Sequence, residues 1–169
     1  MNKNKIIEVA TYIVVPLVMW VVSPLLGKLF DSYYFDHPFI FTKSIPVIIV
    51  GTITILCGTA LVAWTIFLFK TIGRGTPNPK LPPITFVVNG PYRFSRNPMA
   101  FVGLLILLGE SAIYYSPSLF GIAILYGVII YFNAMFVEEP ELKKRFGKLY
   151  ADYLEVVPRF FPNPLKWIK

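Results

Sequence analysis

The sequence predicts an all-α protein that crosses a membrane about four times. Three observations support this fold class. Four long stretches are almost free of charge, only 15% of the 169 residues are charged, and the basic residues gather on one side of the predicted spans. Soluble domains average about 25% charged residues, and about 20 mostly apolar residues suffice for a helix to cross a bilayer. We therefore interpret residues 1–169 as one membrane domain.

Residues 1–69 contain the first two predicted spans. The stretch 6–26 is apolar at all but three positions, and residues 45–69 carry no charge. We expect the first stretch to be a retained helix rather than a signal peptide, because it is longer than a usual signal core and no small-residue cleavage site follows it. The connecting residues 28–43 are rich in Tyr and Phe, which is typical of an aromatic belt at the membrane surface.

Residues 70–97 have a different composition and are predicted to form a long cytoplasmic loop. This segment contains four prolines by position 83 and no acidic residue. Prolines at this density prevent a helix and favour extended or turn conformations. The run ITFVV at 84–88 is β-like. Ordered loops of this length usually have a function.

Residues 98–137 form the third and fourth predicted spans. Only YYSPS joins them, so a tight antiparallel hairpin is expected. We interpret Glu110, near the outer end of the third span, as an interfacial residue. Because the hairpin returns the chain to the same membrane face, Arg96 is expected to lie close to Glu138 and Glu139.

Residues 138–169 form the predicted cytoplasmic tail. Apolar residues recur at helical spacing from Leu142 to Val157, with the charged residues mostly on other faces. This pattern predicts one amphipathic helix at the membrane interface, ending at Pro158.

The net charge of +7 indicates topology rather than nucleic-acid binding. Fourteen of the 16 basic residues fall in the two termini or the central loop, whereas only Lys28 and Lys43 lie between the first two spans. By the positive-inside rule, both termini are cytoplasmic in an integral membrane protein, in the cell membrane if the protein is bacterial. A single cysteine, Cys57, and a single histidine, His37, give neither an intrachain disulfide nor a metal site. We interpret His37 as a surface or interfacial residue.

Polar residues flank the hairpin on its cytoplasmic side, and each has a purely structural interpretation as well as a functional one. Asn97 before Pro98 is a good helix start, with Asn as the N-cap residue. Arg93 and Arg96 are candidates for interfacial anchors. The adjacent carboxylates at 138–139 repel each other when unpaired. They require either an arginine partner or a cationic group on a ligand.

The order of these motifs resembles that of the isoprenylcysteine carboxyl methyltransferase family. The pattern G-x-Y-x-x-x-R-N-P-M occupies residues 90–99, and E-E-x-x-L-x-x-x-F-G-x-x-Y-x-x-Y follows at 138–153 after the hairpin. V-P-R completes the pattern at 157–159. The resemblance covers roughly residues 70–162, so the first span lies outside it.

The resemblance implies an integral membrane methyltransferase that uses S-adenosylmethionine. The acceptor would be a lipophilic small molecule or lipid that enters from the bilayer, with neither nucleic acid nor a metal involved. The cofactor would be held on the cytoplasmic side by the two motif blocks and the preceding loop. The positions that match cofactor-binding residues of the family are Ile84, Thr85, Phe86, Val87, Tyr92, Asn97, Pro98, Met99, Ala100 and Glu138.

The sequence departs from the family pattern at three positions. Asn97 replaces the usual histidine before proline, and Ala100 replaces the usual aromatic residue after Met99. Ala134 stands where enzymes acting on prenylcysteine carry an arginine for the substrate carboxylate. Arg93, Arg96 and Arg145 are the candidates to replace that arginine. The acceptor therefore stays open among a lipid amine, a thiol, a carboxylate and a phenol.

Two other functions remain as alternatives to a methyltransferase. A membrane reductase would need a nicotinamide cofactor, which requires a larger binding footprint than this short chain readily offers. A non-catalytic membrane protein or transporter subunit would be expected to carry polar residues at mid-membrane, and the predicted spans have almost none.

Overall fold

The computed structural model describes residues 3–35, 44–78 and 80–160. This part of the chain consists of helices and loops without a strand, so the β-like run in the central loop forms no strand. The elements in chain order are α1 (Lys3–Leu17), the π-helix η1 (Val18–Val22), α2 (Ser23–Tyr34), α3 (Ile45–Thr71), the 3-10 helix η2 (Gly90–Arg93), α4 (Pro98–Tyr114), α5 (Pro117–Asn133), the π-helix η3 (Ala134–Glu138), α6 (Glu139–Phe146) and α7 (Lys148–Val156).

Within the described residues, three helices are long and apolar enough to cross a membrane. They run over Glu8–Tyr34, Ile45–Thr71 and Pro117–Phe146, because the two π turns join their neighbouring helices without a break. Helix α4 is apolar but shorter, with 17 residues, which is about the minimum for crossing the hydrocarbon core. The all-α membrane architecture predicted from the sequence is confirmed.

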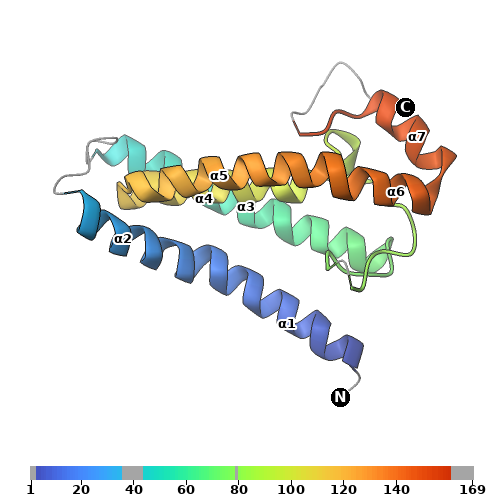
Figure 1. Cartoon of the computed structure of the whole chain (residues 1–169), viewed down its shortest axis with the longest axis horizontal. Helices are drawn as coiled ribbons and strands as arrows, with labels where there is room; N and C mark the ends of the chain where they lie inside the picture. The colour runs from blue at the N-terminus through green and yellow to red at the C-terminus, as the bar shows by residue number, and fades with distance from the viewer. Residues whose placement is uncertain (1–2, 36–43, 79, 161–169) are drawn as a thin grey trace.

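Helices α3, α4 and α5 lie side by side, and α2 packs against α5 (Figure 1). Glycines allow α3 and α4 to approach closely, since a Cβ atom at Gly109 would lie 2.9 Å from the carbonyl oxygen of Gly51. Small residues permit such contacts between membrane helices. Helix α1 diverges from the bundle toward its N-terminal end (Figure 1).

The hairpin between α4 and α5 is as tight as YYSPS predicts. Tyr115 adopts a left-handed conformation with φ of 52°, and the Ser116 hydroxyl accepts a hydrogen bond of 3.0 Å from the amide of Leu119. Ser116 thus caps α5.

The interfacial assignment of Glu110 is wrong. Its relative exposure is only 3%, and the Ser23 hydroxyl donates to its carboxylate at 3.2 Å. The sequence pattern ended the first span near residue 26, whereas α2 continues to Tyr34 and packs against α4 and α5. Ser23 lies within the predicted span, so the packing of α2 against α4 buries a carboxylate that was expected at the surface.

The other differences from the sequence prediction are at helix boundaries. Residues 28–34, expected in a loop, belong to α2. The single tail helix is two helices, α6 and α7, because Gly147 has φ of 54° and interrupts the pattern. His37 lies outside the described residues, as does the end of the tail from position 161.

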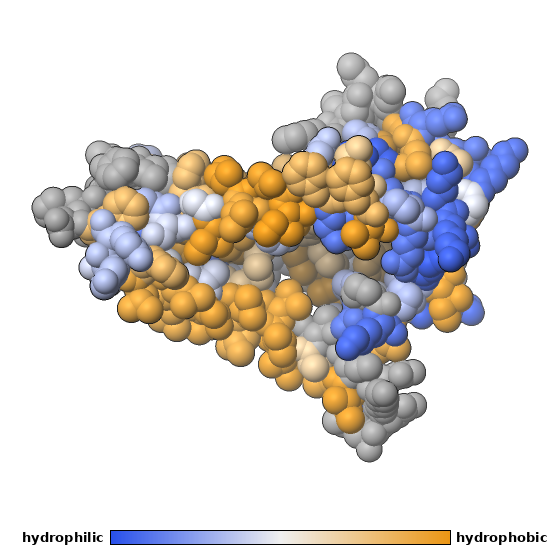
Figure 2. Space-filling view, in the orientation of Figure 1, coloured by the Kyte–Doolittle hydropathy of each residue, from blue (hydrophilic) through white to orange (hydrophobic). Residues whose placement is uncertain are grey.

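Polar and apolar residues occupy different parts of the surface. Hydrophobic residues cover the lengths of the helices, and hydrophilic residues gather at the end formed by α6, α7 and the central loop (Figure 2). Helix α1 begins and α7 ends at this end of the molecule, away from the hairpin turn (Figure 1). Both ends of the described chain therefore share one side, and the assignment of that side to the cytoplasm stays a prediction.

Candidate active site

A cavity of about 610 Å³ lies between α1, α3, the central loop, the hairpin and helices α6 and α7. This volume is typical of small-molecule sites. Its lining changes in character along its length. The polar part is lined by Arg96, Asn97, Glu138, Glu141, Arg145 and Tyr150, and the apolar part by Val15, Met19, Trp20, Val62, Ile66 and Ile106.

The structure brings eight of the ten predicted site residues together at this cavity. Ile84 is separate, since it is 75% exposed and faces a neighbouring cleft. Pro98 is buried in the first turn of α4 and does not line the cavity. The eight that line it are Thr85, Phe86, Val87, Tyr92, Asn97, Met99, Ala100 and Glu138.

The central loop is fixed over the cavity by aromatic contacts. The ring of Tyr92 stacks on Phe69 at 5.4 Å, and the hydroxyl of Tyr153 donates to the carbonyl of Tyr92 at 2.6 Å. Phe86 packs edge-on against Tyr150 and Tyr153. The loop is therefore held by α3 on one side and by α7 on the other.

Two of these tyrosines remain protonated at neutral pH. Burial, followed by the negative charge of Glu138, raises the pKa of Tyr92. Burial, followed by the charge of Glu139, raises the pKa of Tyr150 to about 12. The phenol of Tyr150, which lines the cavity, is thus a neutral hydrogen-bond donor there.

Asn97 begins α4 as predicted, but its side chain makes no capping hydrogen bond. The helix start is held through the backbone instead. The amides of Arg96 and Asn97 donate to the carbonyls of Pro158 and Arg159 at 2.9 and 3.1 Å. The tail segment therefore fixes the helix start, and the Asn97 side chain lines the cavity.

Glu139 is the centre of a largely buried ion cluster. Arg159 binds it through two nitrogens, with Nε donating to Oε1 at 2.6 Å and Nη2 to Oε2 at 3.0 Å. Arg96 Nη1 lies 3.0 Å from Oε1. The expected proximity of Arg96 to the acidic pair is thereby confirmed. The sequence reasoning missed the part played by Arg159, although it quoted the V-P-R motif that contains it.

Glu138 has a different environment from its neighbour. Its carboxylate accepts a hydrogen bond of 2.7 Å from the side-chain amide nitrogen of Asn133, and it makes no ion pair within the described residues. Its side chain lines the cavity from the last position of the π turn η3. Such turns often occur at functional sites. Of the two carboxylates, Glu139 binds the arginines of the protein and Glu138 faces the cavity.

The arginines proposed to replace the one absent at position 134 differ in their positions. Arg96 and Arg145 line the cavity, whereas Arg93 is exposed and does not. Ala134 itself is only 2% exposed and also lies off the cavity. Arg96 and Arg145 are therefore the remaining candidates.

The first helix contributes residues that the sequence reasoning placed outside the site. Tyr12, Pro16 and Trp20 line the cavity at intervals of four residues, and Trp20 lies in the π turn η1. This spacing puts them on one face of the helix. The spacing is the sequence feature that could have indicated a part for this helix in the site. The indole Nε1 of Trp20 is buried and has no hydrogen-bond partner.

The family model described as phospholipid methyltransferase matches residues 46–149, which is more than half of the chain. The chain belongs to this family. The match contains α3 from its second residue, the central loop, the hairpin, α6 and the first two residues of α7. No curated protein matches the chain.

Membership confirms the methyltransferase resemblance that the two motif blocks indicated. Together with the apolar helices it identifies an integral membrane methyltransferase. The matched residues contain the loop and all eight predicted positions that line the cavity. The first helix lies outside the match, although it supplies part of the apolar wall.

Proposed function

We propose that the protein transfers a methyl group from S-adenosylmethionine to a lipophilic acceptor that enters from the bilayer. The observation that carries this proposal is the two-part cavity, polar where the motif blocks meet and apolar between α1, α3 and α4. A charged donor and a lipophilic acceptor need these two environments side by side.

The chemistry of the polar part fits this cofactor. Arg96 Nε is buried without a hydrogen-bond partner, and another nitrogen of the same guanidinium is held by Glu139. An N–H group in this position is suited to a ligand carboxylate. Glu138 is suited to an ammonium group or to ribose hydroxyls, and the ring of Phe86 offers an aromatic face to a cation.

S-adenosylmethionine supplies a methyl group on a positively charged sulfur. The protein's own contribution is to hold the reacting partners in line and to exclude water, and alignment alone can account for much of an enzyme's rate. The loop over the cavity and the fixed start of α4 provide rigid walls for this purpose. Rigid support of a site keeps its reacting geometry constant.

The apolar part favours an acceptor with a hydrocarbon body. Val15, Met19 and Ile106 offer only carbon and sulfur atoms, while Trp20 adds one unpaired N–H group. A hydrogen-bond acceptor on the lipid next to this indole would satisfy it. The acceptor atom stays open among amine, thiol, carboxylate and phenol.

Calorimetric titration of the detergent-purified full-length chain with S-adenosylhomocysteine tests this function. We expect saturable binding of that compound and none of NADPH. Glu138→Gln should weaken binding about tenfold to a hundredfold, because a hydrogen bond to a charged group contributes about 1.5–3 kcal/mol. Glu155→Gln is the matched control, since Glu155 is exposed on α7 and lies off the cavity.

Two results would contradict the proposal. Binding of NADPH without S-adenosylhomocysteine would favour the reductase alternative. Equal affinities for the native chain and Glu138→Gln would show that Glu138 is not part of the cofactor site.

A further inference from the structure

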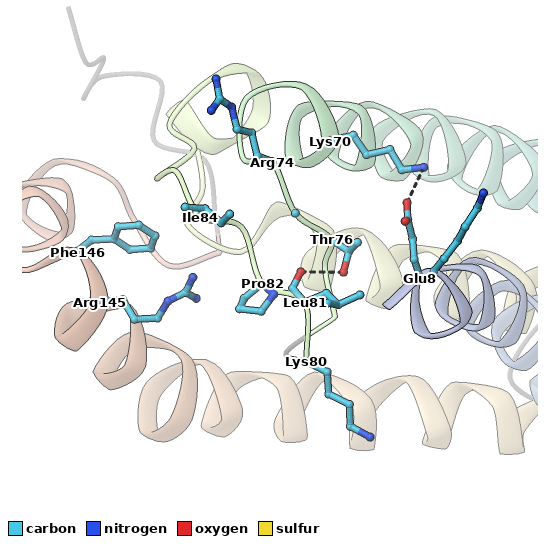
Figure 3. Close-up of a pocket in the computed structure, with 12 residues that line it drawn as sticks. Glu8, Lys70, Arg74, Thr76, Lys80, Leu81, Pro82, Ile84, Arg145 and Phe146 are labelled. Carbon is cyan, nitrogen blue, oxygen red and sulfur yellow. Dashed lines mark hydrogen bonds and ion pairs between the residues drawn. The ribbon is translucent and has the colours of Figure 1, made fainter. Parts of the chain in front are cut away.

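A second cavity of about 1010 Å³ opens at the polar end of the molecule, beside the one already described. It lies between the start of α1, the end of α3, the central loop and α6 (Figure 3). The residues that line both cavities are Thr76, Pro82, Arg145 and Phe146. We call it the basic cleft, and the charged residues that line it are Lys5, Glu8, Lys70, Arg74, Lys80 and Arg145.

The basic cleft has a large excess of positive charge. Five of its lining residues are basic and one is acidic. The single carboxylate, Glu8, pairs with Lys70 at 3.3 Å, and the two side chains point toward one another in Figure 3. Arg74 and Lys80 are exposed and extend from different sides of the loop, away from that pair (Figure 3). Arg145 in turn lies 3.7 Å from Glu141, which is outside the cleft. Lys5, Arg74 and Lys80 make no ion pair among the described residues, so they carry the positive charge that is available to a ligand.

The loop that carries these two cations has a defined conformation. The hydroxyl of Thr76 donates to the carbonyl of Leu81 at 3.0 Å and accepts from the amide of Asn78 at 3.1 Å. Arg74 adopts φ of 52°, which is uncommon for a residue other than glycine. Such conformations persist where the surrounding structure fixes them and are frequent at ligand sites.

The location of the cleft indicates the chemistry of its ligand. Helix α1 begins and α3 ends beside it, so it lies at the depth where the apolar spans meet the lipid headgroups. Basic pockets between membrane helices at this depth bind anionic lipid headgroups. Phosphate oxygens accept charge-assisted hydrogen bonds from Arg and Lys.

We propose that the basic cleft binds the phosphate of an anionic membrane lipid, at a site separate from the methyl-transfer cavity. This assignment rests on the five cations and their position at the membrane surface. It holds whatever the acceptor of the transferred methyl group is, because the binding needs no methyl donor.

The test is native mass spectrometry of the full-length chain in a non-ionic detergent, titrated with phosphatidylglycerol or with phosphatidylcholine. Phosphatidylglycerol should bind more tightly. Arg74→Gln combined with Lys80→Gln should weaken its binding about tenfold to thirtyfold, because each basic group near the surface contributes about a fivefold factor. Lys143→Gln combined with Lys144→Gln is the matched control, since it removes two exposed cations that lie off the cleft.

A third variant, Arg74→Lys with Lys80→Arg, keeps both charges and should keep the binding. This variant keeps the proposal testable if the glutamine variant unfolds. Loss of lipid binding in a folded variant that keeps both charges would overturn the proposal. Equal weakening by the two glutamine pairs would show diffuse attraction to a basic surface and would overturn it as well. Displacement of the lipid by millimolar inorganic phosphate, with the same dependence on Arg74 and Lys80, would assign the cleft to free phosphate rather than lipid.

Discussion

Removing the charge of Glu139 should destabilise the protein more than removing any exposed carboxylate. Glu139 receives two hydrogen bonds from Arg159 and one ion pair from Arg96. These contacts join the start of α6 to the loop before α4 and to the tail after α7. Glu139→Gln keeps the shape of the side chain but leaves two guanidinium groups facing a neutral amide.

The size of the effect follows from the burial of the cluster. The side chains of Glu139, Arg96 and Arg159 are 13%, 12% and 21% exposed. Breaking a buried ion pair costs about 3–5 kcal/mol, and an exposed pair contributes about 0–1 kcal/mol. With this partial exposure we expect a loss of about 2–4 kcal/mol in the free energy of unfolding. At about 2–4 °C per kcal/mol for a chain of this length, the melting temperature should fall by roughly 4–16 °C.

The assay is thermal unfolding of the detergent-purified chain, followed by circular dichroism. Glu141→Gln is the matched control, because Glu141 has a side chain 50% exposed and lies 3.7 Å from Arg145 one helical turn away. Such surface pairs contribute about 0.3–0.5 kcal/mol, so its melting temperature should change by about 2 °C or less.

A double-mutant cycle of Glu139→Gln with Arg159→Gln then measures the coupling between the two groups. Residues in one ion-pair network show coupling energies of about 0.5–3 kcal/mol. Additive effects of the two substitutions, or equal melting temperatures for Glu139→Gln and Glu141→Gln, would refute the reasoning.

Three further predictions concern helix packing, topology and alkaline stability. Gly109→Ala should lower the free energy of unfolding by about 1–3 kcal/mol, because the new Cβ atom would meet the backbone of α3. Gly121→Ala is the control and should change it little, since a Cβ atom there has open space. Thermal unfolding of the two variants compares the effects. Reporter fusions at Lys169 and within residues 36–43 should report opposite sides of the membrane, and the same side for both would contradict the four-span topology. The Tyr150 pKa is raised from 10.0 to about 12, so the folded chain holds this proton more tightly than the unfolded chain. The contribution of Tyr150 to the free energy of unfolding should therefore be constant below pH 10 and be lost between pH 10 and 12. A smaller fall in stability over this range in Tyr150→Phe checks the assignment.

The membrane fold could be predicted because it depends on averages over many residues. Four stretches almost free of charge fix the spans regardless of the details of any one position. The boundaries depend on single residues and could not be predicted in the same way. The first helix continues past residue 26 through a Tyr-rich segment to Tyr34. The burial of Glu110 against Ser23 depends on how α2 packs on α4, which the sequence pattern does not show. The interruption at Gly147 likewise depends on one backbone conformation.

The candidate site was predicted where motif and topology agreed. Two motif blocks separated by a hairpin must meet at one membrane face, and Arg96 and Glu139 do meet there. The separate roles of Glu138 and Glu139 could not be inferred, because the two residues are adjacent in the sequence and only the folded tail places Arg159 against one of them. Ile84 lines the neighbouring cleft rather than this cavity, since adjacent residues in a loop can point in different directions, and its place in the site stays a prediction.

The helix that the family match leaves out has a large part in the selectivity expected of this enzyme. The matched residues 46–149 supply most of the polar end of the cavity, where the proposed methyl donor would be held. The wall beyond it is formed in part by the first membrane-spanning helix, through Met19 and Trp20 in η1. A hydrophobic wall distinguishes ligands mainly by their shape. A buried unpaired N–H group also distinguishes ligands that carry a hydrogen-bond acceptor at that point from ligands that do not. Under the proposed function, the choice of acceptor is therefore made largely by the first membrane-spanning helix, on which Tyr12 and Trp20 each bring a buried polar atom without a hydrogen-bond partner to the cavity.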